Sequence, residues 1–119
     1  MKNSVLWAAA LLCACSGPPA PDAALCEDVV NRLCLARTCP GVNEALAPGD
    51  DCRATLLERT GCGAEAFTFS TPSRERILEC REPLVRRGTS PGLAPTCNEV
   101  AEVVLDCADV VQFLGGARP

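Results

Sequence analysis

Ten cysteines in 119 residues are the side chains whose type and spacing offer the most chemistry. Eight of them lie beyond residue 15, at Cys26, Cys34, Cys39, Cys52, Cys62, Cys80, Cys97 and Cys107. An even set in roughly 95 residues is typical of a small exported domain held by four disulfides. Metal binding is the alternative, but the chain has no histidine, and no C-x-x-C occurs after residue 15. We therefore expect disulfides, with no metal and no cofactor.

The side chains that usually perform catalysis are scarce. The chain has no histidine and no tyrosine, its only lysine is Lys2, and its cysteines are expected to be oxidised. Carboxylates, hydroxyls and arginines remain, and the sequence shows no pattern that pairs a nucleophile with a base. The composition therefore predicts a protein that is not an enzyme.

Charge and aromatic content argue against a nucleic-acid partner. Residues 15–119 contain ten arginines, no lysine and fifteen acidic residues, which gives a side-chain charge of −5. Phosphate backbones attract basic surfaces, so an acidic chain is a poor match for them. Only Phe67, Phe69 and Phe113 remain as aromatic residues, too few for a base-stacking platform.

One acidic stripe is the clearest surface feature. It consists of Glu99, Glu102, Asp106 and Asp109, which fall on one side of an expected helix. A solvated helix face is the ordinary interpretation, and a docking face for a basic protein partner is the functional one. No loop of the D-x-D-x-D-G type accompanies the stripe, so no calcium site is predicted.

The first fifteen residues have the layout of an export signal. Lys2 supplies a positive charge, and an apolar run without acids follows over residues 4–14. The run is about 11 residues long, well short of the ~20 that a membrane-spanning helix needs. It ends in Leu12-Cys13-Ala14-Cys15, which resembles the lipobox of bacterial lipoproteins. The resemblance implies cleavage before Cys15, whose thiol would carry a diacylglycerol.

The resemblance also implies a location and a domain plan. Residues 1–14 would be the signal peptide, residues 15–21 the lipidated cysteine with a Pro-rich tether, and residues 22–119 the cysteine-rich helical domain. The lipid would anchor the protein in the bacterial cell envelope. We expect the outer membrane or the surface and not the inner membrane, because Ser16 stands where some retained lipoproteins have Asp. Ordinary secretion with cleavage elsewhere is the alternative.

Four helical segments are expected to position the cysteines. Apolar periodicity and capping residues predict helices over residues 22–37, 52–60, 71–87 and 96–114, with a short helical turn over 42–46. The expected N-caps are Asp22, the pair Asp50-Asp51, Thr71 and Thr96, and Pro83 should kink or split the third helix. No segment is a convincing strand. The sequence therefore predicts an all-α, four-helix, disulfide-stapled domain after a signal peptide and a Pro-rich tether.

Two predictions concern the sides of these helices. The core side of the first helix is expected to hold Leu25, Cys26, Val29, Val30, Leu33 and Ala36, and that of the last helix Val100, Ala101, Val104, Cys107, Ala108 and Val111. Arg74 and Arg81 fall within the apolar side of the third helix. They are expected either to extend from its edge or to pair with acids of a neighbouring helix.

Helix geometry limits the disulfide pairing. Cys97 and Cys107 would be about 15 Å apart on one helix, and Cys26 and Cys34 about 12 Å apart on another. A disulfide needs Cα atoms within ~7 Å, so neither pair is expected. One economical solution makes the first and last helices antiparallel. It pairs Cys26 with Cys107 and Cys34 with Cys97, and leaves the other four cysteines to pair among themselves.

Two functions are compatible with these features. The first is a lipid-anchored binding or structural module of the cell envelope. The alternative is a carrier that holds a small apolar ligand between stapled helices. A continuous apolar cavity of about 300 Å³ or more would favour the carrier.

Overall fold

A computed structural model describes residues 20–88 and 92–116 of the chain. The predicted signal peptide, the lipidation site Cys15 and most of the predicted tether lie outside the described residues. Of the predicted helical domain, residues 22–88 and 92–116 lie within the described ranges.

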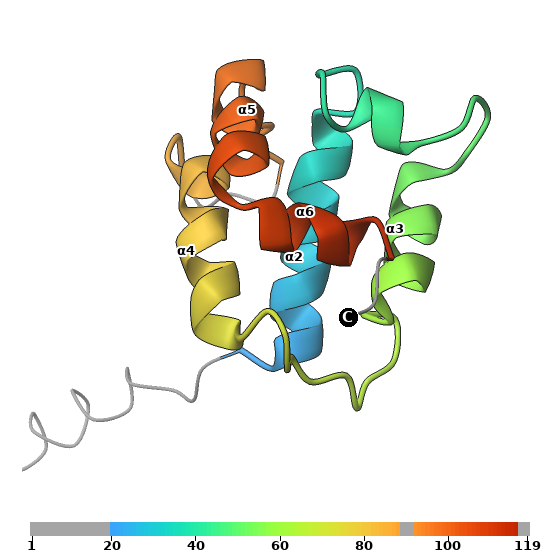
Figure 1. Ribbon diagram of the computed structural model, residues 1–119, viewed down its shortest axis with the longest axis vertical. Coiled ribbons are helices and arrows are strands. Elements are labelled where there is room, and N and C mark those ends of the chain that lie inside the picture. Colours follow the sequence, from blue (N-terminus) through green and yellow to red (C-terminus); the bar gives the residue numbers. More distant parts are fainter. Residues whose placement is uncertain (1–19, 89–91, 117–119) are drawn as a thin grey trace, which may run out of the picture.

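Within the described ranges the chain forms five α-helices, one short 3-10 helix and no strand. They are α2 (Asp22–Leu35), η1 (Asn43–Ala45), α3 (Cys52–Thr60), α4 (Arg74–Val85), α5 (Cys97–Asp106) and α6 (Ala108–Leu114). Figure 1 shows α2 in the middle of the domain, with α4 on one side and α3 on the other. α5 packs beside α4, and α6 contacts both α5 and α3. The all-α expectation is confirmed, but the count of four helices is wrong.

The additional helix arises because the segment 96–114 is broken at Cys107. This residue has φ −126° and ψ 54°, so α5 ends before it and α6 begins after it. Its sulfur is bonded to Cys80 of α4, which fixes the chain at the break. The segment contains neither glycine nor proline between its ends, so the break has no local signal in the sequence.

Several predicted helix ends are confirmed. The Asp51 side chain accepts a hydrogen bond from the Ala54 N–H over 2.8 Å, and Gly61 ends α3 with φ 81°. Thr96 and Glu99 form a complete capping box at the start of α5. The predicted turn near residue 44 is the 3-10 helix η1.

Two predictions about helix ends are wrong, and the third helix is not split at Pro83. Asp22 lies in the first turn of α2, since Pro21 occupies the cap position and its carbonyl accepts from the Leu25 N–H. α4 begins after Ser73, whose hydroxyl accepts from the Arg76 N–H, and not after Thr71. Pro83 does not split α4, because it lies in the last turn, where one missing hydrogen bond leaves little helix to disrupt.

The predicted core side of α2 is confirmed, since all six of its members are buried. The core side of α5 and α6 is displaced from the prediction. Its buried members are Val100, Val103, Cys107, Val110 and Leu114, which follow a 3-4-3-4 spacing. Val104 and Val111, which were expected in the core, are 37% and 38% exposed. Their exposure leaves an apolar surface on α5 and α6.

Candidate functional site

All eight cysteines of the helical domain form disulfides. The pairs are Cys26–Cys62, Cys34–Cys52, Cys39–Cys97 and Cys80–Cys107, with Cα–Cα distances of 5.9, 5.7, 5.3 and 6.2 Å. These distances lie within the usual range for a disulfide. The expected closed set of four disulfides is therefore present.

The proposed pairing was wrong, although the two pairs excluded by helix length are indeed absent. Both cysteines of α2 bond to the α3 region, through Cys62 and Cys52. Neither Cys97 nor Cys107 bonds to α2. The physical reason is that α2 packs against α3 and α4, so its two cysteines meet cysteines of the α3 region and not those of the last segment.

The four acids of the predicted docking face do not form one free stripe. Glu99 is only 8% exposed, and its carboxylate accepts the Thr96 N–H over 2.8 Å. Glu102 pairs with Arg86 over 2.9 Å. Asp106 lies at the end of α5, before the break, and Asp109 lies beyond it on α6.

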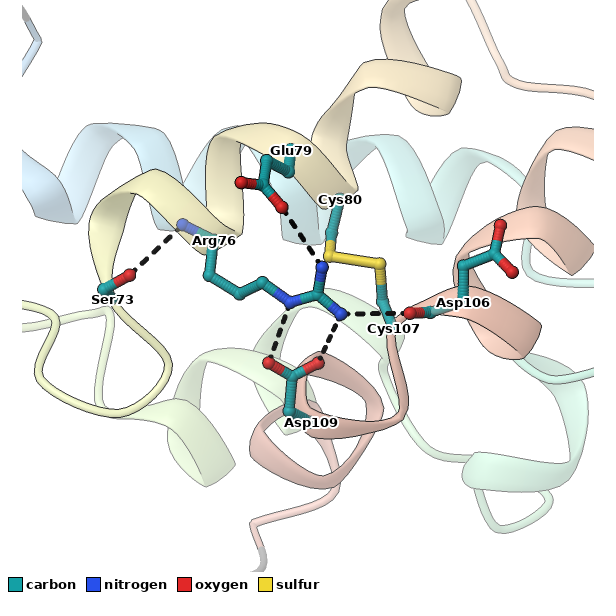
Figure 2. A network of polar contacts seen from close by, with 7 residues as sticks. All are labelled: Ser73, Arg76, Glu79, Cys80, Asp106, Cys107 and Asp109. Carbon is teal, nitrogen blue, oxygen red and sulfur yellow. Dashed lines mark hydrogen bonds and ion pairs between the residues drawn. A yellow bond between two sulfur atoms is a disulfide. The ribbon is translucent and has the colours of Figure 1, made fainter.

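Asp109 belongs to a network around Arg76 that joins α4 to α5 and α6, the two parts of the broken helix (Figure 2). The Arg76 guanidinium donates to both carboxylate oxygens of Asp109, to Glu79, and to the backbone carbonyl of Asp106. The disulfide between Cys80 and Cys107 lies beside it. Hydrogen bonds from Arg76 hold the pKa of Asp109 below its ordinary value. Part of the acidic stripe therefore serves an interface inside the domain.

Arg74 and Arg81 pair with acids of the neighbouring helix α2, one of the two expected arrangements. Arg74 donates to Asp22 over 2.6 Å, and Arg81 donates to Asp28 over 2.7 Å. Asp28 also accepts from Arg32 over 2.8 Å, and the side chain of Arg32 is only 2% exposed. These contacts tie α2 to α4 through charged groups at the edge of the core.

The carboxyl groups of Asp22 and Asp28 both have pKa values below the ordinary value of an aspartate. The Phe69 N–H and then Arg74 donate hydrogen bonds to Asp22, and these lower its pKa. Burial raises the pKa of Asp28, but the hydrogen bonds from Arg32 and Arg81 outweigh it and lower the pKa overall. Both groups are therefore ionised and structural at neutral pH.

An apolar groove of about 290 Å³ lies between the short helix η1, α3 and the broken helix. Its walls come from α2, the η1 segment, α3, α5 and α6, and include Leu33, Val42, Leu46, Leu56, Val104 and Val111. Gly41, with φ 97°, approaches Val104 so closely that an added Cβ would lie 2.8 Å from Cγ2. Two disulfides join segments that line the groove, Cys34–Cys52 between α2 and α3 and Cys39–Cys97 between the η1 segment and α5.

Arg59 of α3 lines the same groove. Its Nη1 donates to the carbonyl of Ala45 over 2.8 Å, and this contact joins α3 to η1. Its stem lies against the chain after α6, because a Cβ on Gly116 would be 3.4 Å from Cβ and Cγ of Arg59. A positioned guanidinium therefore stands beside an apolar surface.

The groove was not identified from the sequence, and Arg59 was not singled out. The available signal was the pair Val104 and Val111, which are seven residues apart and were assigned to the core. A wider depression of about 490 Å³ beside the start of α2 is more open to solvent. It is lined mostly by small side chains such as Ala23, Ala24 and Gly63.

The three phenylalanines form a second cluster, next to Arg59. The rings of Phe67 and Phe69 meet edge to face with centroids 5.0 Å apart, and Phe113 lies 6.2 and 6.1 Å from them. Contacts of this kind are typical of packed aromatic groups. The cluster holds the irregular segment 61–71 against α6.

Comparisons of the chain with protein-family models, with curated proteins and with solved structures gave no match. Among residues 20–88 and 92–116, no three His, Cys, Asp or Glu side chains gather as metal ligands would. No helix in this part of the chain has the length and apolar character required to span a membrane.

Proposed function

We propose that this chain is a lipoprotein of the bacterial cell envelope, and that its disulfide-stapled helical domain is a binding or structural module without catalytic activity. The observation that carries the proposal is the closed pairing of the eight cysteines from Cys26 to Cys107. Disulfides form and persist in exported proteins. Because these eight cysteines pair with one another, none of them requires Cys15 as a partner, which supports lipidation of Cys15.

The N-terminus provides the direct test. In the mature protein purified from membranes, intact-mass analysis should find Cys15 as the first residue, with a diacylglycerol on its thiol and an acyl chain on its amine. Cys15→Ser should abolish processing and lipidation. Cys13→Ser is the matched control, because it changes the other cysteine of the leader and should leave both steps intact. A different N-terminus, or loss of lipidation in the control variant, would argue against the proposal.

The groove favours a second candidate function, the carrier of a small apolar ligand. Its volume of about 290 Å³ lies at the lower end of the range of small-molecule sites. Val104 and Val111 leave apolar surface exposed that a ligand would cover. A titration with an uncharged fluorescent dye such as Nile red tests this function. Val111→Phe should weaken dye binding by filling the groove, whereas Leu105→Phe should not, since Leu105 is 80% exposed and lies outside the groove.

A further inference from the structure

Arg59 differs from most of the arginines in the described part of the chain. Six of those arginines lie within 4.0 Å of a carboxylate, namely Arg32, Arg53, Arg74, Arg76, Arg81 and Arg86. In residues 20–88 and 92–116, no carboxylate lies at that distance from Arg59. Its one hydrogen-bond partner there is the carbonyl of Ala45. It is also the one arginine among the residues that line the apolar groove.

The contact with Ala45 orients the guanidinium without neutralising it. A guanidinium has five N–H donors, and the Ala45 carbonyl occupies one of them. The remaining donors can still present the planar fork that binds a carboxylate through two hydrogen bonds. Arg59 is half-buried, and its stem is held against Gly116, so little conformational freedom remains to be lost on binding.

We propose that the groove binds an aliphatic carboxylate, whose alkyl chain lies on the apolar wall formed by Leu56, Val104 and Val111 and whose head group pairs with Arg59. The inference rests on the carrier function proposed above for the same groove. A volume of about 290 Å³ suits a medium-length alkyl chain and not a folded partner. One guanidinium in a domain of net charge −5 matches a single negative charge better than the double charge of a phosphate monoester.

The test compares two probes that share an alkyl chain and differ in the head group. The mature chain from Ser16, exported behind a cleavable signal in place of residues 1–15, keeps every described residue and avoids detergent. Calorimetric titration should give a dissociation constant for decanoate about tenfold lower than for decanol, the gain expected from hydrogen bonds to a charged group. Arg59→Gln should remove this preference and leave decanol binding unchanged. Arg59→Lys should retain part of it.

Two matched controls separate the head group from the groove. Arg53→Gln removes a charge from the same helix outside the groove and should keep the preference for decanoate. Val111→Phe should weaken both probes, and Leu105→Phe neither. Intact mass confirms four disulfides, and circular dichroism confirms the helical fold, in every variant.

The outcomes distinguish the two proposals. Equal affinity for decanoate and decanol, with both lost in Val111→Phe, would overturn the carboxylate assignment and support the carrier function. A preference for decanoate that persists in Arg59→Gln would overturn the role of Arg59. Absence of binding by both probes would overturn the carrier function together with the inference.

Discussion

Arg76 and Asp109 are joined by two parallel hydrogen bonds, from Nε to Oδ2 over 2.9 Å and from Nη2 to Oδ1 over 3.1 Å. The pair links α4 to α6 across the point where the predicted last helix is broken. The same guanidinium donates to the carbonyl of Asp106, which lies at the end of α5. Arg76 thus stabilises the two ends of the break at once, beside the disulfide of Cys107 (Figure 2).

Arg76→Gln should lower the free energy of unfolding by a small but measurable amount, because an exposed ion pair contributes little and this one has good two-bond geometry. Chemical denaturation of the oxidised protein measures this change. Arg87→Gln is the control, because Arg87 is exposed and has no ion pair within the described residues, and it should stay within about 0.5 kcal/mol of wild type. Equal losses in the two variants would contradict the role assigned to Arg76.

Asp28→Asn should lower the free energy of unfolding by about 2 kcal/mol, more than Arg76→Gln does. Asp28 accepts from both Arg32 and Arg81, and the Arg32 side chain is only 2% exposed, so the substitution removes a charged acceptor from a buried guanidinium. Glu27→Gln on the same helix provides the comparison. Its contact with Arg53 is 3.9 Å long and exposed, so thermal melting should detect little change.

Stability should fall in acid. The pKa values of Asp22 and Asp28 are lowered in the folded protein, so their contribution is complete above the unfolded value of about 3.9 and is lost as pH falls through the lower folded values. The melting temperature should therefore change little between about pH 7 and pH 5 and decline below about pH 4. Asp22→Asn should make this decline shallower. A melting temperature that rises on acidification would contradict the assignment.

The disulfides should contribute unequally. Cys39–Cys97 closes a separation of 58 residues and Cys34–Cys52 one of 18. In the chain-entropy description the longer closure stabilises by about 1 kcal/mol more. The double variant Cys39→Ala/Cys97→Ala should therefore lose more stability than Cys34→Ala/Cys52→Ala in denaturant titrations. Peptide mapping without reduction checks the pairing itself, and a Cys26–Cys107 peptide would contradict it.

The features that could be predicted from the sequence were local. The apolar side of α2 and the caps at Asp51 and Thr96 depend on residues within a few positions of each other, and all are confirmed. The closed set of four disulfides followed from cysteine number and from the absence of histidine. Each of these predictions needed no knowledge of how the helices pack.

The features that were missed depend on packing. The break at Cys107 results from the link to Cys80 and from the contact with Arg76, both on another helix. The pairing of the cysteines depends on which helices lie beside α2, and periodicity carries no information about that. The groove arises because the break displaces the buried side of α5 and α6 and leaves Val104 and Val111 at the surface.

The order of the disulfides along the chain has a consequence for proteolysis. The spans Cys26–Cys62, Cys39–Cys97 and Cys80–Cys107 overlap one after another, so every peptide bond between residues 26 and 107 lies inside at least one of them. A single cut by a protease anywhere in this stretch therefore releases no fragment. The nicked chain gains the mass of one water molecule and remains a single molecule until a reductant separates its parts.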